Sequence, residues 1–384
     1  MRHGREVVIV EAVRTPVGRG HPERGVFRDC HPEELLGAVL VEVIARAGIP
    51  AAAVGDVIGG CVQQVAEQAY NVTRNAWLAA GLPVETPAMT VDRQCGSGQQ
   101  AVNLAAALIG VGAHDVAIGA GVEHMGHVPL ALGLQLAAAH GSPWPSALLE
   151  RFALVGQGES AELIADRWGV TRERCDAIAL RSQQRAARAA AQGRFDREIV
   201  AVAGVSADQG IRPETTLEGL AALAPAFRPD GAHTAGNSSQ VSDGAAAVLL
   251  MARERADELG VVPRARIVDQ LTVGVDPVLM LTGPIPATRE ILERNGLAIG
   301  DLDLIEVNEA FASVIAAWEL ELEPDPERVN VNGGSIAIGH PLGSTGARLL
   351  TTLLHELERT GGRLGLVTMC CGGGLGTATL IERI

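Results

Sequence analysis

Residues 91–109 read VDRQCGSGQQAVNLAAALI, a turn of small residues followed by an apolar pattern with helical spacing. Glycines at positions 96 and 98 allow a tight turn and the close approach of a second group. Short β-branched runs at Val57–Ile58 and Val116–Ile118 flank this stretch and predict strands. Strands and helices therefore alternate, which indicates an α/β fold.

The same alternation recurs at both ends of the chain. A strand predicted at Val7–Val10 precedes a helix predicted at Leu35–Ala47. The pattern returns from Ala265 onwards and ends with strands predicted at Gly365–Thr368 and Thr377–Ile381. Two similar α/β halves are therefore expected.

The region from about Val122 to Asp243 differs from both halves and is interpreted as an insertion. Prolines punctuate it, at positions 143, 145, 213, 225 and 229. One predicted helix is rich in arginine, at positions 174, 181, 185 and 188. Such spacings are typical of a solvated helix face, but in an acidic protein these side chains are also candidate phosphate partners.

Composition excludes several classes of function. The chain has 384 residues, 47% of them hydrophobic, so it can bury a sizeable core. A net charge of -14 argues against a nucleic-acid surface. All 31 basic residues are arginine, and without lysine there is no Schiff-base, pyridoxal-phosphate or P-loop lysine.

The N-terminal sequence MRHGREVVIVEAVRTPVG predicts no signal peptide, because it lacks a long apolar core and a cleavage site. The longest apolar stretches, such as Ala101–Gly112, are too short to span a membrane. The six cysteines form no CxxC pair and do not have the density of a disulfide-rich scaffold. We therefore expect a soluble cytoplasmic protein.

Cys95 is the first candidate for chemistry. A cysteine just before a helix lies in the positive field of the helix N-terminus, which favours the thiolate and predicts a nucleophile. Alternatively, a structural strand-to-helix turn would need similar small residues. The stretch NVNGGSIAIGHPLGSTGAR, residues 330–348, places His340 in a glycine-lined loop, where it can act as a base or an oxyanion donor.

Two further clusters contain reactive or buried polar groups. The stretch TMCCGGGLG, residues 368–376, has adjacent cysteines that suit neither a tetrahedral metal site nor an unstrained disulfide. One catalytic thiol beside one packed thiol is the better interpretation. In EVNEAFA, residues 306–312, Asn308 and Glu309 follow an apolar run and need hydrogen-bond partners if they are buried.

Together the four clusters resemble the thiolase family, through the motifs QCGSG, NEAFA, GGSIAIGHPLGSTGAR and CxGGGxG. Their order and spacing agree along essentially the whole chain, and VRTPVGR and TAGNSSQVSDGAAA are also similar. The family's motif is a cysteine, one variable residue and then glycines. Cys370 is therefore the matching cysteine, and Cys371 fills the variable position.

The resemblance implies a thiolase, an acyltransferase that cleaves 3-ketoacyl-CoA to acetyl-CoA and a shortened acyl-CoA, or runs the Claisen condensation in reverse. It makes Cys95 the nucleophile that carries the acyl group, His340 its base and Cys370 the group that protonates the enolate. Asn308 would hold a water that, with His340, faces the thioester or enolate oxygen. The backbone N–H groups of Cys95 and Gly372 would face the tetrahedral oxygen, each donor being worth roughly 3 to 4 kcal/mol.

Coenzyme A is implied as a co-substrate, with no tightly bound cofactor and no metal. Arg212, Phe227 and Ser239 match the family's coenzyme A contacts. The chain departs from the family at Gly156-Gln157, where many thiolases have His-Met, and at Gly219, where serine is frequent. These departures concern pantetheine binding and acyl-chain preference.

The family fold is a layered α-β-α-β-α arrangement of two similar halves with an inserted loop domain. We assign residues 1–121 and 244–265 to the N-terminal half, 122–243 to a loop domain that binds coenzyme A and covers the site, and 266–384 to the C-terminal half. A homodimer or homotetramer is expected, with the segment from His124 to Trp144 as a candidate tetramer contact. Partners other than acyl-CoA and coenzyme A are not expected.

Three alternatives remain at this point. A degradative enzyme for fatty acids or steroid side chains is favoured by QCGSGQQAV, but a biosynthetic acetoacetyl-CoA thiolase shares every catalytic motif. A ketoacyl synthase is disfavoured because it needs a lysine. A non-catalytic acyl-CoA or lipid-binding protein would be favoured by loss of Cys95, His340 or Cys370, and all three are present.

Overall fold

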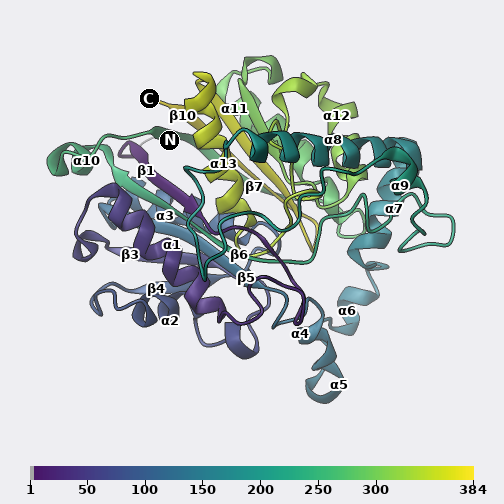
Figure 1. The fold of residues 1–384 in the computed structure, drawn as a ribbon, viewed down its shortest axis with the longest axis horizontal. Coiled ribbons are helices and arrows are strands. Elements are labelled where there is room, and N and C mark those ends of the chain that lie inside the picture. The colour runs from purple at the N-terminus through teal and green to yellow at the C-terminus, as the bar shows by residue number, and fades with distance from the viewer. Residues whose placement is uncertain (1–3) are drawn as a thin grey trace.

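The computed structural model describes residues 4–384, so Met1, Arg2 and His3 of the N-terminal stretch considered above lie outside the described residues. The described residues form one mixed sheet of ten strands. The strand order is β4-β3-β5-β6-β1-β7-β10-β9-β8, with β2 beside β6 (Figure 1). The strands are β1 (Val7–Arg14), β2 (Gly18–Arg19), β3 (Asp56–Gly60), β4 (Ala88–Val91), β5 (Val116–His124), β6 (Ser242–Ala252), β7 (Ala265–Gly274), β8 (Leu304–Val307), β9 (Leu364–Cys371) and β10 (Leu375–Arg383).

The sheet consists of two halves with the same connectivity. The first strand of each half, β1 or β7, pairs antiparallel with the last one, β6 or β10. The next strand, β5 or β9, is antiparallel to that one and parallel to β3 or β8. Within the described sheet, the halves are joined by the pairing of β1 with β7, through the register Val8↔Arg266 and Ile9↔Ala265. The predicted α/β fold with two similar halves is confirmed.

Helices form three layers around the two halves of the sheet. The α-helices are α1 (Pro32–Ala47), α2 (Val72–Ala79), α3 (Ser97–Gly110), α4 (Leu132–Gln135), α5 (Ala137–His140), α6 (Ser146–Leu149), α7 (Gln157–Trp168), α8 (Arg172–Ala191), α9 (Leu217–Ala221), α10 (Arg253–Leu259), α11 (Pro284–Asn295), α12 (Ala312–Leu322) and α13 (Thr345–Thr360). Short 3₁₀ turns are η1 (Ala51–Ala53), η2 (Ala66–Gln68), η3 (Met280–Thr282), η4 (Ile299–Asp301) and η5 (Pro326–Arg328).

The central layer is made by α3 and α13, which pack against each other and against strands of the sheet; α13 contacts β6 and β1 of one half and β9 and β8 of the other. Helices α1 and α2 cover the first half, and α11 covers the second, with α12 beside it (Figure 1). The predicted α-β-α-β-α layering is therefore confirmed. Every residue of β6 is buried, because helices cover both faces of the sheet.

The segment between β5 and β6 contains α4 to α9. Helices α4, α5 and α6 project from the body, whereas α7 and α8 pack on α12 (Figure 1). Of the α8 arginines predicted to form a solvated face, Arg174 and Arg188 are exposed, whereas Arg181 is half-buried and Arg185 is buried. Arg174 and Arg181 form ion pairs with Glu319 of α12, and Arg185 donates to the Val329 carbonyl at 2.6 Å. These guanidinium groups hold α8 on the C-terminal half.

Within the described part of the chain, no helix combines the length and apolar character that a bilayer span requires. The same residues contain no cluster of histidine, cysteine and carboxylate groups arranged to hold a metal ion.

Candidate active site

Cys95 lies in the turn that joins β4 to α3, and its side chain is only 2% exposed. The turn is fixed by Ser97, whose Oγ accepts from the Arg93 N–H at 2.9 Å and donates to the Gln94 carbonyl at 2.6 Å. Gln94 adopts a left-handed conformation with φ of 50°. This conformation reverses the chain direction and presents Cys95 at the start of the central helix.

The loop that carries His340 packs directly on this turn. A Cβ added to Gly98 would lie 2.7 Å from the Gly343 carbonyl oxygen, so only glycine allows the two loops to approach this closely. The buried carboxylate of Glu123, near the end of β5, accepts a hydrogen bond from the Gly343 N–H at 2.9 Å. The two halves thus contribute one loop each to the same place.

Hydrogen bonds determine which nitrogen of His340 can act as a base. The Thr345 hydroxyl donates its proton to the Pro341 carbonyl at 2.8 Å, so at 2.7 Å from His340 Nδ1 it must accept. Nδ1 therefore carries the proton, and Nε2 keeps a free electron pair. Burial, and then the nearby Arg348 guanidinium, lower the pKa of His340 to about 3. The imidazole is neutral at pH 7.

Asn308 is held beside His340 by a chain of donors. Arg348 donates to Ser335 Oγ at 3.0 Å, and Ser335 donates to Asn308 Oδ1 at 2.6 Å. The amide orientation is fixed in this way, and Asn308 Nδ2 points at His340 Nε2, 3.3 Å away. Sequence analysis predicted Asn308 and His340 but missed Ser335, Thr345 and Arg348, although all three lie inside the histidine motif.

Cys370 and Cys371 end β9, where consecutive side chains point to opposite faces of the strand. Both are free thiols. Cys371 packs under the nucleophile turn, since a Cβ on Gly96 would lie 2.6 Å from its sulfur. Cys370 is fully buried, and burial followed by the charge of Cys95 raises the pKa of its thiol well above the usual value. Cys370 therefore holds its proton in the resting protein.

Interactions with the backbone N–H groups of Gly372 and Cys95 itself and with the Gln157 side chain act on the pKa of the Cys95 thiol. Each of them lowers its pKa, but burial has the larger effect and raises the value to about 11. Burial therefore outweighs the interactions that favour the thiolate at this helix N-terminus. Desolvation disfavours the charged form of each group, so Cys95 and His340 are both neutral at pH 7.

Thr345→Val is expected to reduce kcat of the reaction proposed below roughly 10- to 100-fold, part of the 10²–10⁴-fold that a general base contributes. The change keeps the shape but removes the acceptor that fixes the His340 tautomer. Steady-state kinetics should show a fall in kcat with little change in KM. Thr351→Val, which removes a comparable buried hydroxyl bonded to the Ala347 carbonyl on the same helix, should keep kcat. Equal losses in both variants would contradict the tautomer argument.

The three candidate coenzyme A residues lie in the segment between β5 and β6. Phe227 is 45% exposed, and its ring packs edge-on against Phe311 with a centroid distance of 5.7 Å. The Ser239 N–H donates to the Ala310 carbonyl at 2.9 Å, so both residues adjoin the segment after Asn308. Arg212 is exposed, and its backbone is fixed at both ends: its N–H donates to Gln183 of α8 at 2.8 Å, and its carbonyl accepts from Thr215 Oγ1 at 2.8 Å. Its guanidinium is available to an anion.

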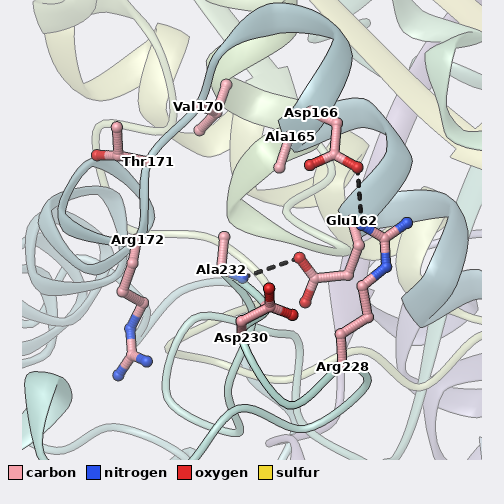
Figure 2. A pocket seen from close by; sticks show the side chains of 10 residues that line it. Glu162, Ala165, Asp166, Val170, Thr171, Arg172, Arg228, Asp230 and Ala232 are labelled. Atoms are coloured by element: carbon pink, nitrogen blue, oxygen red, sulfur yellow. Dashed lines mark hydrogen bonds and ion pairs between the residues drawn. The ribbon is translucent and has the colours of Figure 1, made fainter.

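Figure 2 shows a pocket of about 240 Å³ between α7, the start of α8 and the loop at 228–232. In the described structure, its lining includes none of the predicted site residues. Its acidic and basic groups are largely engaged, Arg228 by Asp166 at 2.7 Å and Glu162 by the Ala232 N–H at 2.9 Å. The described lining of this pocket contains no cysteine and no histidine, so the buried residues Cys95, Cys370 and His340 remain the candidate active site.

Comparisons with known proteins cover almost the entire chain. Residues 7–254 match the family model described as thiolase, N-terminal domain, and residues 261–383 match thiolase, C-terminal domain. The chain is 45% identical to the steroid 3-ketoacyl-CoA thiolase FadA6 of Mycobacterium tuberculosis, covering 99% of this chain and 94% of the relative. It is 46% identical to the 3-ketoacyl-CoA thiolase of Aliivibrio salmonicida, covering 99% and 100%. The solved acetyl-CoA acetyltransferase of Bacillus anthracis superposes over the full length of both chains with a TM-score of 0.91 and 40% identity.

Proposed function

This chain belongs to the thiolase family, and from that membership we propose that it cleaves 3-ketoacyl-CoA with coenzyme A through an acyl-enzyme on Cys95. The products are acetyl-CoA and a shortened acyl-CoA. The observation that supports this most directly is the buried cluster in which Cys95, Cys370 and the Gly372 N–H interact. Two relatives are named 3-ketoacyl-CoA thiolases, one of them a steroid 3-ketoacyl-CoA thiolase, and these names support a degradative direction.

The neutral pair of Cys95 and His340 suits attack on an uncharged thioester substrate. Cys95 attacks the 3-keto carbon while its proton moves to His340 Nε2, which is the unprotonated nitrogen in the tautomer held by Thr345. The tetrahedral oxygen faces the N–H groups of Cys95 and Gly372, which already donate to the sulfur. The protonated Nε2 then becomes a donor for the thioester oxygen of the leaving enolate, beside the amide of Asn308.

Carbon–carbon cleavage releases the enolate of acetyl-CoA, and the Cys370 thiol supplies the proton to its carbon. This requires Cys370 to be protonated beforehand, which its raised pKa ensures. The resulting Cys370 thiolate takes the proton of the incoming coenzyme A thiol. That thiol attacks the acyl group, and Cys95 leaves and recovers its proton from His340. Protons balance over the cycle without a metal.

Coenzyme A reaches this cluster, in our proposal, past Phe227 and Ser239, with its phosphates near the free guanidinium of Arg212. The assignment of residues 122–243 to a loop domain, the absence of a tightly bound cofactor, a cytoplasmic location and a homodimer or homotetramer remain predictions from the sequence.

The test is mass spectrometry of the intact protein after brief mixing with acetoacetyl-CoA or with a longer 3-ketoacyl-CoA. We expect a mass increase equal to the acyl group, mapping to Cys95 and discharged by added coenzyme A as a shortened acyl-CoA. Stronger labelling by the longer substrate would support the degradative role, whereas labelling by acetoacetyl-CoA alone would indicate the biosynthetic alternative. No adduct from either substrate, with coenzyme A binding intact, would favour a non-catalytic acyl-CoA-binding protein.

A further inference from the structure

Gln157 reaches the nucleophile from a part of the chain that the catalytic motifs do not include. It is the first residue of α7, and its side chain is close enough to the Cys95 thiol to lower the pKa of that thiol. A methyl group placed on Gly372 would lie 3.1 Å from Gln157 Nε2, so the amide lies against the backbone that also donates to Cys95. Because the side chain of Gln94, the neighbour of Cys95, approaches the same built methyl group to 3.2 Å, the Gln157 amide lies beside the nucleophile turn.

Gln157 differs from the second glutamine near Gly372 in the group that its side chain presents there. Gln94 approaches Gly372 from another direction, but its Nε2 donates to the Asp92 carboxylate at 3.2 Å, and its Oε1 lies 3.2 Å from the same built methyl. Gln94 thus presents an acceptor, whereas Gln157 presents a donor. Only a donor can stabilise negative charge on the sulfur.

The start of α7 also packs against a partly exposed side chain. Gly156 precedes the helix without a side-chain cap, and the ring of Phe227 lies directly on Gly158, where it leaves no room for a Cβ. Phe227 is partly exposed, whereas Cys95 is buried. Gln157 directly precedes Gly158, on which Phe227 packs, and we therefore place it where a pantetheine arm passing Phe227 would approach Cys95.

We propose that Gln157 is a further catalytic residue, whose side-chain amide donates to the Cys95 sulfur whenever that sulfur carries negative charge. It would act during attack on the substrate and again when Cys95 leaves the acyl group. The inference rests on the proposed thiolase reaction. It assigns a role to the position at which this chain has glutamine and many thiolases have methionine.

Several other groups act on the same sulfur, so the effect must be measured as a difference between variants. Glu123 of β5 raises the pKa of Cys95, and Cys370 and Cys371 of β9 are coupled to it. The imidazole of His340, on the neighbouring loop, is neutral. None of these groups changes when Gln157 is replaced by a residue of similar size.

The experiment compares the pH dependence of Cys95 alkylation by iodoacetamide in the wild type, Gln157→Met and Gln157→Glu, following the Cys95 peptide by mass spectrometry. Because the folded pKa of Cys95 is raised to about 11, the alkylation rate should rise with pH throughout the range below it. Gln157→Met removes the donor at similar volume and should shift this profile upward by about one pH unit, which is roughly a tenfold lower rate at fixed pH. Gln157→Glu introduces a negative acceptor and should shift it further. Gln94→Met is the matched control, with less than about a threefold change expected, because that amide donates only to Asp92.

Thiolysis kinetics complete the test. Gln157→Met should reduce kcat roughly tenfold with a smaller change in KM, in line with its alkylation shift. Superimposable alkylation profiles of the wild type and Gln157→Met would overturn the proposal, as would a shifted profile with unchanged kcat. Alkylation needs no substrate, so its outcome is independent of whether the wild type cleaves 3-ketoacyl-CoA. Failure of the wild type to do so would instead refute the proposed function.

Discussion

Replacing Cys95 with serine is expected to reduce thiolysis by on the order of 10⁴-fold or more, because removing a nucleophile eliminates the covalent route. A serine hydroxyl has a far higher pKa than a thiol, and the neutral His340 is a weak base that burial has made weaker. The oxyanion donors at Gly372 and Asn308 remain in Cys95→Ser but have no intermediate to stabilise. Steady-state assays with a 3-ketoacyl-CoA and coenzyme A measure the loss directly.

Cys30→Ser is the control for this experiment. Cys30 belongs to the hydrophobic core around α1 and lies outside the proposed site. This variant should retain activity within about threefold, as expected for a change remote from the reacting atoms. Thermal unfolding should confirm that Cys95→Ser is folded. Turnover above about one hundredth of the wild type in Cys95→Ser would show that another group carries the acyl chain.

Replacing Cys370 with alanine is expected to separate the two halves of the reaction. Carbon–carbon bond cleavage should fall on the order of 10³-fold, within the range that positioned acid–base groups contribute. Acetylation of Cys95 by acetyl-CoA needs no proton transfer at carbon and should fall much less. Exchange of the acetyl-CoA methyl protons with solvent deuterium, followed by mass spectrometry, reports on Cys370 alone.

The neighbouring thiol provides a matched comparison for that variant. Cys371→Ala removes the same atom one position along β9, from the side that packs under Gly96. It should keep deuterium exchange and turnover within a few fold, with only a modest loss of stability from the small cavity. If Cys371→Ala lost exchange and Cys370→Ala kept it, the assignment of the carbon acid–base group would have to be reversed.

The arginines of α8 show why spacing alone was a poor guide to charged side chains. Arginine at positions 174, 181 and 185 predicts an exposed helix face when α8 is considered by itself. In the folded chain, α12 lies alongside and presents Glu319, which pairs with two of the three. A helix pattern identifies a polar face, but only the neighbouring element determines whether water, phosphate or a carboxylate meets it.

The acid–base state of the nucleophile likewise depended on packing. The sequence placed Cys95 at a helix N-terminus, where the helix field favours a thiolate. The fold also buries that thiol completely, and desolvation outweighs the field and the three hydrogen bonds. Such a balance requires the burial and every donor to be known together. Sequence supplies the donors' identities but not their distances.

By itself, the sequence determined the α/β class and the duplicated halves through local periodicity, whereas Cys95, Asn308, His340, Cys370 and Gly372 are site predictions that rest on the resemblance of its motifs to the thiolase family. Only the tertiary structure decided the His340 tautomer, the Ser335 and Arg348 chain behind Asn308, the neutral state of Cys95 and the contact from Gln157. The environment of Cys95 depends on groups that are remote in sequence, whereas the His340 tautomer depends on Pro341 and Thr345, which are nearby but oriented only in the folded loop. Chain folding, rather than any local pattern, brings such groups within hydrogen-bonding distance.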